Sequence, residues 1–279
     1  MLLLDGRALA ARRLPALRAR ADAVRTARAR APRLGILAFG DAAGVAPHVV
    51  GKVRAGAAAG VDVVLEVVAA GSSLDEALHR CVSLAKDPHL DGLFVQFPYP
   101  DPSWAAAIEE AIPERLDVDV MSPSGVRRFA SDSAALPPVT VSAALELVDA
   151  FGVTVKGLGG VVVAEASDFA RMFRRAFIRR GAMIPPLLSP LKAAADPWLA
   201  TAPLVIVAVG QPGFLRALQL APDAVAIDVG YFNVGGRGDI DLTGGALHLG
   251  ALAPVPGGIG PMTVSCLLER TIHFAEGRR

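Results

Sequence analysis

A lysine and a histidine share one predicted helix and have side chains that can move protons. Lys52 follows His48 by four residues, a spacing that places both on the same helix face. The chain has 28 lysines and arginines together, and only four of them are lysines. A lysine can lower its pKa in a cleft and serve as an acid or a base, which an arginine cannot do. We therefore treat Lys52 as a candidate catalytic residue, with an ordinary surface lysine as the alternative.

Polar side chains also lie where predicted strands end. Gln96 lies at the end of a buried apolar run, and Asp117 and Asp119 lie two residues apart in the sequence LDVDV. On an extended segment, residues two apart share a face, so the two aspartates are expected to point the same way. Ligands of open α/β sheets bind beyond the carboxyl ends of the strands. These residues therefore predict a ligand site, although Gln96 alone could equally be a hydrogen-bonded amide of the core.

A segment rich in glycine and proline precedes the last predicted helix. Residues 254–263 read PVPGGIGPMT and contain three glycines and three prolines. Proline fixes φ, and glycine permits close approach of another group to the backbone. We expect a rigid loop with accessible backbone groups, for which a purely structural turn is the alternative.

The elements that must position these residues are two successive series of alternating strands and helices. Short apolar runs alternate with helical segments, and the pattern restarts after Pro138. This alternation predicts a parallel α/β arrangement in each half of the chain. Ser73 is expected to cap a helix, with Glu76 completing a capping box. The expected strands are 34–40, 61–68, 90–98, 159–167, 204–210 and 224–230, and the expected helices are the first 30 residues, 47–59, 73–86, 142–151, 168–180 and 263–275.

Composition narrows the class of protein. Of the 279 residues, 53% are apolar and 20% are charged, which suits a folded core rather than global disorder. No run of 18 uncharged apolar residues exists, and the first residues make a poor signal peptide, so no membrane partner is expected. A net charge of +1 gives no reason to expect a nucleic acid partner. The motifs HExxH and CxxC do not occur, and no metal site is expected.

Two further expectations concern the cysteines and the arginines near the start. Cys81 and Cys266 lie far apart in apolar helical contexts, so we expect buried thiols in a reducing compartment. Arginines at helical spacing near the start are expected to form a solvated helix face. These arginines are Arg18, Arg20, Arg25, Arg28 and Arg30.

Several segments, in order along the chain, resemble the motifs of one family. The loop PGGIGPMT is nearly the signature of the methylenetetrahydrofolate dehydrogenase/methenyltetrahydrofolate cyclohydrolase family. The segment LDGLFVQFPYP is similar to the family's VDGxxVQLPLP, and PERLDVDVMSP is similar to PxKDVDGxxP. Three further segments are similar to other motifs of the same family: LVIVAVGQPGFL, AVAIDVGYFNVGGRGDIDL and GDAAGVAPHVVGKVRAG. The resemblance extends from about residue 2 to residue 275.

The resemblance implies a fold and a set of site residues. It implies two α/β domains with a cleft between them, a folate-binding catalytic domain at 1–140 plus 263–279 and a Rossmann-like domain at 141–262. The last helix returns to the N-terminal domain, and the protein is expected to be a cytoplasmic homodimer. The implied catalytic residues are Lys52, Gln96, His48 in place of the family's tyrosine, and Asp119, which also anchors the pterin if one extra residue near Leu116 is allowed. Further substrate contacts are expected from Pro98, Tyr99, Pro256, Gly257, Gly258, Ile259 and Pro261.

The turn after the strand 159–167 departs from the family's VVGRSxxVGxP, which holds the NADP phosphates. After Ala164, Glu165 stands in place of a phosphate-binding arginine and Ala166 in place of a serine, and the glycines are missing. Only Ser189 remains of a second motif, CHSxT. A carboxylate repels a phosphate, and losing one charged hydrogen bond costs about 1.5–3 kcal/mol. We therefore expect a degraded NADP site and no functional use of NADP.

The sequence thus predicts a folate-dependent one-carbon enzyme without NADP-dependent redox chemistry. Its expected substrate is 5,10-methylene- or 5,10-methenyltetrahydrofolate. Hydrolysis of the methenyl group and methylene transfer to a second small-molecule acceptor both fit the residues. The alternatives are the ordinary bifunctional dehydrogenase/cyclohydrolase and a non-catalytic folate-binding protein.

Overall fold

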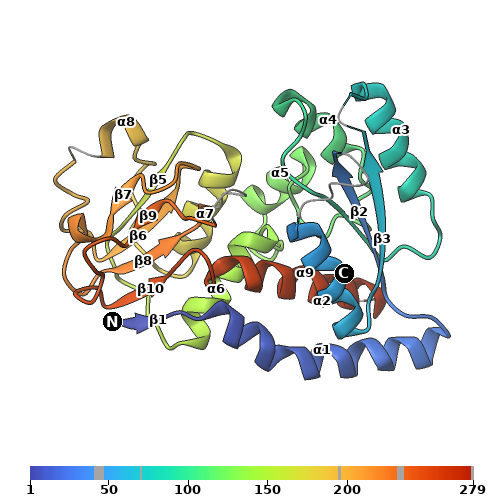
Figure 1. The fold of residues 1–279 in the computed structure, drawn as a ribbon, viewed down its shortest axis with the longest axis horizontal. Coiled ribbons are helices and arrows are strands. Elements are labelled where there is room, and N and C mark those ends of the chain that lie inside the picture. Colours follow the sequence, from blue (N-terminus) through green and yellow to red (C-terminus); the bar gives the residue numbers. More distant parts are fainter. Residues whose placement is uncertain (41–46, 70, 194–195, 231–235, 278–279) are drawn as a thin grey trace. The chain divides into compact units, whose positions relative to one another are not determined.

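The chain folds into two compact units, each assembled from two separate stretches of sequence. In the computed structural model, one unit comprises Met1–Ala10 and Thr140–Thr263, and the other comprises Ala11–Val139 and Val264–Arg279. Each unit has its own parallel sheet (Figure 1). The structure describes residues 1–40, 47–69, 71–193, 196–230 and 236–277, and of residues 47 and 48 it describes the backbone only.

The unit that contains residues 140–263 is built on a five-stranded sheet in the order β1-β10-β8-β6-β5 (Figure 1). Neighbouring strands are parallel throughout, and nearly every residue of the inner strands is buried. Near-continuous apolar runs are typical of strands that are covered on both faces. The strands are β1 Leu2–Leu3, β5 Gly160–Ala164, β6 Leu204–Ala208, β8 Val225–Asp228 and β10 Ala251–Ala253, with a small pair of β7 Leu215–Arg216 and β9 Ile240–Asp241; the helices are α6 Val139–Ala150, α7 Asp168–Arg179, α8 Pro190–Ala193 and η3 Ala217–Gln219.

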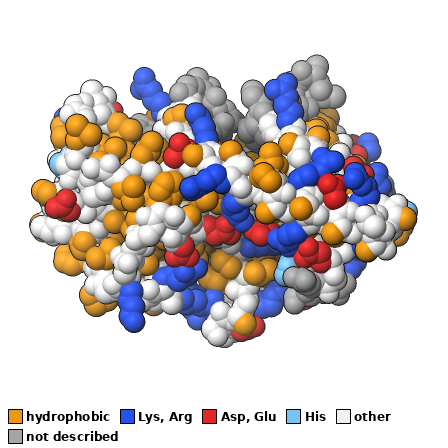
Figure 2. Space-filling model, turned by 90° about the horizontal axis from the view of Figure 1, so that it is seen from below, with side chains coloured by type: hydrophobic (Ala, Val, Ile, Leu, Met, Phe, Trp, Pro, Cys, Tyr) orange, Lys and Arg blue, Asp and Glu red, His pale blue; other side chains and the backbone are white. Residues whose placement is uncertain are grey.

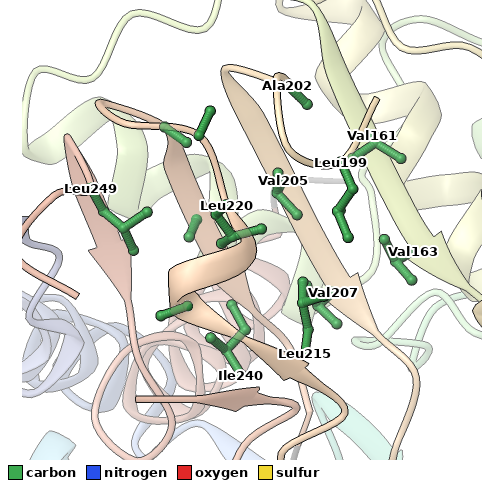
Figure 3. Close-up of a cluster of buried hydrophobic side chains, with 14 of the residues drawn as sticks. Val161, Val163, Leu199, Ala202, Val205, Val207, Leu215, Leu220, Ile240 and Leu249 are labelled. Atoms are coloured by element: carbon green, nitrogen blue, oxygen red, sulfur yellow. The ribbon is translucent and has the colours of Figure 1, made fainter. Parts of the chain in front are cut away.

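One face of this sheet carries a core of aliphatic side chains. Val205 and Val207 project from the same side of β6 and pack among Leu215, Leu220 and other buried residues (Figure 3). Side chains two residues apart on a strand point to the same face of the sheet, which is why Val205 and Val207 both join this cluster. The core therefore fixes β6 rigidly, and with it the turn at its carboxyl end.

The second unit has a three-stranded parallel sheet in the order β3-β2-β4. Ser73 caps one helix by accepting a hydrogen bond from the backbone N–H of Glu76 at 3.2 Å, which is the first half of the expected capping box. The strands are β2 Arg33–Phe39, β3 Asp62–Val68 and β4 Gly92–Val95; the helices are α1 Gly6–Arg28, α2 Pro47–Ala59, α3 Leu74–Ala85, η2 Pro102–Trp104, α4 Ala105–Glu110, α5 Pro123–Ser131 and α9 Ile259–Ala275.

The expected two-domain α/β fold is confirmed, with two differences at the ends of the chain. The sequence predicted that residues 1–140 belong to one domain. In the structure, β1 pairs with β10, and Met1–Ala10 therefore belong to the unit that contains residues 140–263. The last helix begins at Ile259 rather than at residue 263, inside the glycine- and proline-rich segment. Pro261 is tolerated there because the first-turn N–H groups of a helix have no partner within the helix.

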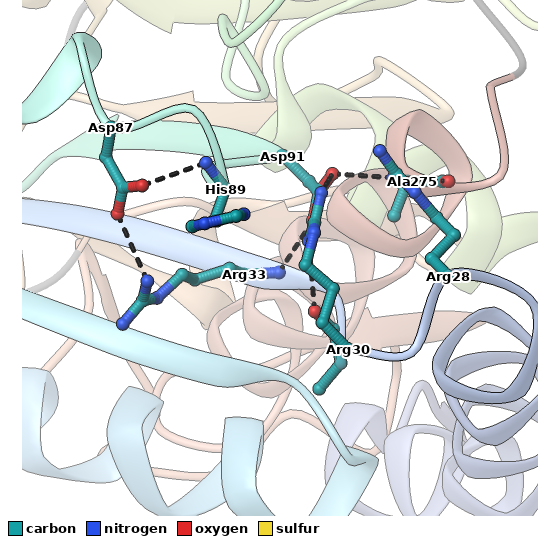
Figure 4. Close-up of polar contacts among 8 residues, drawn as sticks. Arg28, Arg30, Arg33, Asp87, His89, Asp91 and Ala275 are labelled. Atoms are coloured by element: carbon teal, nitrogen blue, oxygen red, sulfur yellow. Dashed lines mark hydrogen bonds and ion pairs between the residues drawn. The ribbon is translucent and has the colours of Figure 1, made fainter.

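The arginines of α1 and the following turn correct the expectation of a solvated face. Arg20 pairs with Glu269 at 2.9 Å and with Glu276 at 3.0 Å, both on or just after α9. Arg28 and Arg30 pair with Asp91, whose side chain is only 5% exposed. Figure 4 shows Arg28 and Arg30 meeting Asp91, and Figure 2 shows acidic side chains among basic ones on the face that it draws. Helical spacing alone could not reveal these partners because they are distant in sequence.

Replacing Asp91 by alanine should lower the free energy of unfolding by about 3 kcal/mol. Asp91 accepts hydrogen bonds from Arg28 at 2.9 Å, from Arg30 at 2.6 Å and from the backbone N–H of Arg33 at 3.0 Å (Figure 4). Removing one partner of a buried pair leaves the other charges uncompensated, and this costs more than the pair contributes. Denaturant unfolding measures the loss. Asp149→Ala is the matched control, because the pair of Asp149 with Arg180 is about half exposed and should contribute below about 1 kcal/mol. Equal losses of unfolding free energy in the two variants would contradict the argument.

Three sequence expectations concern membranes, metals and thiols. Among the described residues, no helix is long and apolar enough to cross a bilayer. Within the same residues, histidine, cysteine and acidic side chains do not gather into a group that could hold a metal ion. Cys81 and Cys266 are both buried, and no disulfide joins them, as expected.

Candidate active site

Lys52 and Gln96 meet at the carboxyl end of β4. Lys52 comes from α2 and donates a hydrogen bond from Nζ to Gln96 Oε1 at 2.7 Å. Gln96 directly follows β4, and its backbone N–H bonds to the carbonyl of Leu37 on β2, which fixes the start of its side chain. Its Nε2 donates to the carbonyl of Phe97 at 2.6 Å, so Oε1 is turned toward the lysine. Two residues that the resemblance implies are catalytic are thus in direct contact.

The environment of Lys52 favours its neutral form. Its side chain is buried, with Nζ 5.4 Å from the centre of the Phe94 ring. Burial lowers the pKa of Lys52 to about 8, against the opposing effect of the negative charge on Asp119. A group with that pKa has about a tenth of its population neutral at pH 7 and can act as a base or an acid.

Asp117 and Asp119 have different surroundings, and the segment between them is not extended as expected. Asp117 is buried and accepts hydrogen bonds from the backbone N–H of Val120 and from the Ser122 hydroxyl, both at 2.7 Å. The bond to Val120, three residues on, folds the segment into a turn in which Val120 has a φ of 62°. Ser122 in turn caps α5 by accepting the N–H of Gly125 at 3.0 Å. Asp117 therefore has a local structural role.

Asp119 is the carboxylate whose charge acts on Lys52. It is half-buried and accepts one weak hydrogen bond, from the backbone N–H of Val139 at 3.2 Å. Burial and the neighbouring charge of Asp117 raise the pKa of Asp119 to about 6, against the opposing effects of the Val139 hydrogen bond and of the charges of Arg270 and Lys52. A carboxylate so poorly supplied with donors is able to accept hydrogen bonds from a ligand.

Arg270 holds this segment in place and was not singled out from the sequence. It is buried on α9 and donates to the carbonyl of Val118 at 2.8 Å and to that of Pro137 at 2.9 Å. The last helix therefore supports the loop that carries Asp119. An arginine within a largely apolar helix was the available signal, but its partners lie 152 and 133 residues away in the sequence.

Tyr99, one of the expected substrate contacts, is hydrogen-bonded to an acidic residue that the sequence did not indicate. It follows the exposed residues Phe97 and Pro98, and its hydroxyl donates to Glu109 Oε1 from α4. Its ring centre lies 5.5 Å from that of Phe39. Burial and the charge of Asp119 raise the pKa of Glu109 to about 8, against the opposing effect of the hydrogen bond from Tyr99.

The other expected contacts lie in the loop before and at the start of α9. The Gly258 N–H bonds to the carbonyl of Pro254 at 2.8 Å, and the Arg7 N–H bonds to the carbonyl of Gly257 at 3.2 Å. A Cβ on Gly6 would lie 1.8 Å from the Gly258 carbonyl oxygen, so the chain packs against this loop with no room for a side chain. Hydrogen bonds and close packing hold this loop in place. Its members Pro256, Gly257, Gly258, Ile259 and Pro261 belong to the unit of residues 140–263, and a cleft shared with Lys52 stays a prediction.

His48 is the remaining catalytic candidate. Its backbone lies at the start of α2, one turn before Lys52. Its side chain lies outside the described residues. Its role in proton transfer therefore stays a prediction.

The turn after β5 carries the residues of the expected degraded NADP site. Ala164 ends β5, and Glu165 and Ala166 are exposed. The helix that follows, α7, is capped by Ser167, whose hydroxyl accepts the Ala170 N–H at 3.2 Å. Ser189 lies before α8, where its carbonyl accepts the N–H groups of residues 192 and 193.

Two aspartates lie at the carboxyl ends of β5 and β6 or in the turns that follow them. Asp168 lies in the first turn of α7 and pairs with Arg171 at 2.7 Å, which puts a negative charge at the end of the helix that attracts anions. At the end of β6, the Asp239 carboxylate accepts the backbone N–H groups of residues 209, 210 and 211 at 2.6, 3.0 and 2.8 Å. The expected loss of the NADP site at the β5 turn stays a prediction.

Comparison with known proteins covers both units. Residues 4–119 match the tetrahydrofolate dehydrogenase/cyclohydrolase catalytic domain, and residues 138–279 match the NAD(P)-binding domain of the same family. The chain is 32% identical over 276 residues to the bifunctional protein FolD 2 of Frankia alni, covering 98% of this chain and 96% of that one.

Two solved structures have the same fold over the whole chain. The bifunctional FolD methylenetetrahydrofolate dehydrogenase/cyclohydrolase of Campylobacter jejuni is 26% identical with a TM-score of 0.86, and the match covers 100% of both chains. The FolD of Trypanosoma brucei, complexed with NADP and an inhibitor, is 24% identical with a TM-score of 0.87, and the match covers 99% of this chain and 97% of that one. The second likeness concerns the fold alone.

Proposed function

Because the chain belongs to the tetrahydrofolate dehydrogenase/cyclohydrolase family, we propose that it is a bifunctional enzyme of folate one-carbon metabolism. It oxidises 5,10-methylenetetrahydrofolate to the 5,10-methenyl form and hydrolyses that form to 10-formyltetrahydrofolate. The observation that carries the proposal is the contact of a buried, easily deprotonated Lys52 with Gln96, next to the charge of Asp119. Support for the oxidation step comes from the matches to the NAD(P)-binding domain and to bifunctional relatives.

The hydrolysis step can be derived from Lys52 and Gln96. A water molecule attacks the methenyl carbon of the cationic substrate, and its proton passes to the neutral Lys52 amine. The ring carbon–nitrogen bond of the hydroxyl adduct then breaks, and the released nitrogen keeps the electron pair and takes the proton back from Lys52. The hydroxyl proton of the adduct passes to water as the C=O bond forms, which leaves the formyl group on the other nitrogen and Lys52 neutral again. In its neutral form the amine donates one proton to Gln96 Oε1, which orients its lone pair away from the glutamine and toward the water.

Asp119 is proposed to bind the pterin ring. The aminopyrimidinone edge of the pterin offers two parallel N–H donors, and one carboxylate can accept both. The backbone N–H of Val139 occupies one Asp119 oxygen only weakly, at 3.2 Å. The side chain thus has acceptor capacity for a ligand that bridges from Asp119 to Lys52.

A second candidate function is favoured by the turn after β5. The family's NAD(P)-binding domain supports cofactor use, yet Glu165 and Asp168 put negative charge where a phosphate would bind. A folate enzyme without redox chemistry, either a cyclohydrolase alone or a methylene transferase with a small-molecule acceptor, agrees with that turn.

One assay separates the two candidates. The enzyme is given 5,10-methylenetetrahydrofolate with NADP, with NAD or with neither, and folates are followed by mass spectrometry while reduced cofactor is followed by absorbance. The proposed bifunctional activity requires reduced cofactor and 10-formyltetrahydrofolate to appear together. Hydrolysis of the methenyl form without any cofactor reduction supports the second candidate. Failure to turn over any folate contradicts both.

Replacing Glu165 by arginine should tighten NADP binding by about tenfold. The change removes a repulsive carboxylate and adds a cation that can make a charged hydrogen bond, and such a bond contributes about 1.5–3 kcal/mol. Calorimetric titration with NADP measures the effect. Glu165→Gln is the control and should give a smaller gain, because it removes the repulsion without adding a cation. An unchanged dissociation constant in Glu165→Arg would mean that residue 165 does not face the phosphate.

From the family resemblance we also propose that the protein is a homodimer and that it is located in the cytoplasm. Sedimentation equilibrium of the purified protein tests the first. Fractionation of cells that contain the protein tests the second.

A further inference from the structure

One arginine of the last helix reaches the loop that carries Asp119. Arg270 is a buried residue of α9, and its Nη1 and Nη2 atoms donate hydrogen bonds to the carbonyls of Val118 at 2.8 Å and of Pro137 at 2.9 Å. The proposed hydrolysis and the proposed pterin contact do not use this arginine directly. A buried cation costs free energy unless charges and hydrogen bonds offset the cost. The groups around Arg270 therefore show what the arginine acts on.

The two carbonyls bracket Asp119 along the chain. The Val118 carbonyl belongs to the planar peptide group that joins Val118 to Asp119, so a hydrogen bond to it fixes the direction in which the chain enters Asp119. Pro137 lies two residues before Val139, whose N–H donates to the Asp119 carboxylate at 3.2 Å. One guanidinium thus holds both the segment that carries the carboxylate and the segment that donates to it.

The helix that carries Arg270 packs closely on β4. A Cβ on Gly92 would lie 2.6 Å from a Val118 methyl group and 3.1 Å from the Thr271 hydroxyl. The strand, α9 and the segment before residue 119 therefore meet around a glycine with little room for a side chain. This packing fixes the arginine relative to the strand that Gln96 follows.

The charge of Arg270 acts on Asp119 as well. Burial and the charge of Asp117 raise the pKa of Asp119, whereas the charges of Arg270 and Lys52 lower it. Only the ionised carboxylate has its full capacity to accept two N–H groups, so a nearby cation supports the form that can bind a pterin. Among the described residues, the titratable groups whose charges interact with Asp119 are Asp117 of the same segment, Lys52 of α2, Tyr99 after β4, Glu109 of α4 and Arg270 of α9.

We propose that Arg270 is a positioning residue of the folate site that acts through Asp119: its two hydrogen bonds orient the carboxylate, and its positive charge keeps the carboxylate ionised for the N–H groups of the pterin. The inference rests on the proposed folate function, because the pterin supplies those donors. The last helix then determines substrate affinity and its pH dependence without touching the substrate through this residue.

The test compares variants by equilibrium titration with tetrahydrofolate over a range of pH and by steady-state kinetics on methenyltetrahydrofolate. Arg270→Gln removes the charge and one arm of the fork, so it should weaken binding and raise KM by about tenfold at neutral pH, while kcat stays within about twofold. The wild type should lose affinity below about pH 6, the pKa of Asp119, and Arg270→Gln should lose it at a pH about one unit higher, because loss of the cation raises that pKa. Arg270→Lys keeps the charge but not the fork, so it should weaken binding by about fivefold and keep the wild-type pH midpoint.

A double-mutant cycle separates action through Asp119 from a general effect on the fold. In the Asp119→Ala background, Arg270→Gln should weaken tetrahydrofolate binding by less than about twofold, because the group through which the arginine acts is gone. A purely structural arginine would lower the affinity by the same factor in both backgrounds, and that result would overturn the inference.

Arg20→Gln is the matched control for loosening the last helix. Arg20 of α1 pairs with Glu269 at 2.9 Å and with Glu276 at 3.0 Å, so its loss should lower stability while KM, kcat and the pH midpoint stay unchanged. Thermal unfolding must show each variant folded at the assay temperature. If Arg270→Gln does not fold, Arg270→Lys takes its place, and a KM equal to that of the wild type then overturns the inference.

The wild type distinguishes a failure of this inference from a failure of the proposed function. A wild type that neither binds nor turns over a folate contradicts the proposed function itself. If the wild type does bind tetrahydrofolate, an unchanged affinity and an unchanged pH midpoint in folded Arg270→Gln overturn the inference alone.

Discussion

Replacing Lys52 by methionine is expected to lower the turnover of 5,10-methenyltetrahydrofolate by about 10²–10⁴-fold, the range for loss of one acid–base group. Methionine fills a similar volume along the same path through the core but has no proton to give or take. Lys52 is buried, and its amine makes a direct bond to Gln96 at 2.7 Å. The substitution therefore removes the reactive group while leaving the surrounding packing in place.

The pH dependence of the wild type shows which form of Lys52 is active. If the neutral amine is the base, kcat/KM should rise with pH and level off above about 8, the pKa to which burial lowers Lys52. Protonation of Asp119 below about pH 6 should reduce folate binding as well, because a protonated carboxyl has less capacity to accept two N–H bonds. A rate that falls above pH 8 would mean instead that Lys52 acts through its positive charge.

Lys86→Met is the matched control for Lys52→Met. Lys86 is an exposed lysine in the same unit, at the end of α3, and its loss should change turnover by less than about twofold. Circular dichroism and thermal unfolding establish that both variants are folded. Near wild-type turnover in folded Lys52→Met would overturn the assignment of Lys52 as the proton-transfer group.

Local patterns in the sequence were sufficient to predict most elements and the strand end at which Gln96 lies. Helix 47–59 and the strand that ends near Gln96 could be predicted because apolar spacing reflects which faces are buried. The carboxyl ends of parallel strands meet at one edge of a sheet, which is why Gln96 was expected near a ligand site. The bond between Lys52 and Gln96 agrees with that expectation.

Contacts between distant segments could not be predicted in this way. The pairs of Arg30 with Asp91 and of Tyr99 with Glu109 join residues on separate elements, and only the packing of those elements brings them together. A charged residue in a helix has the same local pattern whether it faces water or a buried partner. The turn at Asp119 was missed for a related reason, because the Asp117 side chain bends a segment whose alternation predicts a strand.

Asp119→Ala is expected to weaken tetrahydrofolate binding by at least tenfold. The carboxylate is proposed to accept two N–H groups of the pterin, and each donor left unpaired in a buried site costs about 1–3 kcal/mol. Since 1.4 kcal/mol corresponds to a factor of ten in affinity, the loss of both bonds amounts to about 30-fold to 10⁴-fold. Equilibrium titration with tetrahydrofolate measures it, and the free energy of unfolding should change little because the one protein bond to Asp119 in this site is long, at 3.2 Å.

Asp117→Asn is the informative comparison. The family's pterin-binding aspartate falls on Asp119 only if one residue is inserted near Leu116, so Asp117 is the rival assignment. Asp117 accepts the N–H of Val120 and the hydroxyl of Ser122, so its replacement should lower stability and leave the affinity of the folded protein nearly unchanged. The two aspartates then separate cleanly, one by affinity and the other by unfolding. If Asp117→Asn loses affinity while Asp119→Ala keeps it, the pterin is bound by the other carboxylate. If neither variant loses affinity, the folate is not bound through this turn, and the site built around Lys52 must recognise its substrate by other groups.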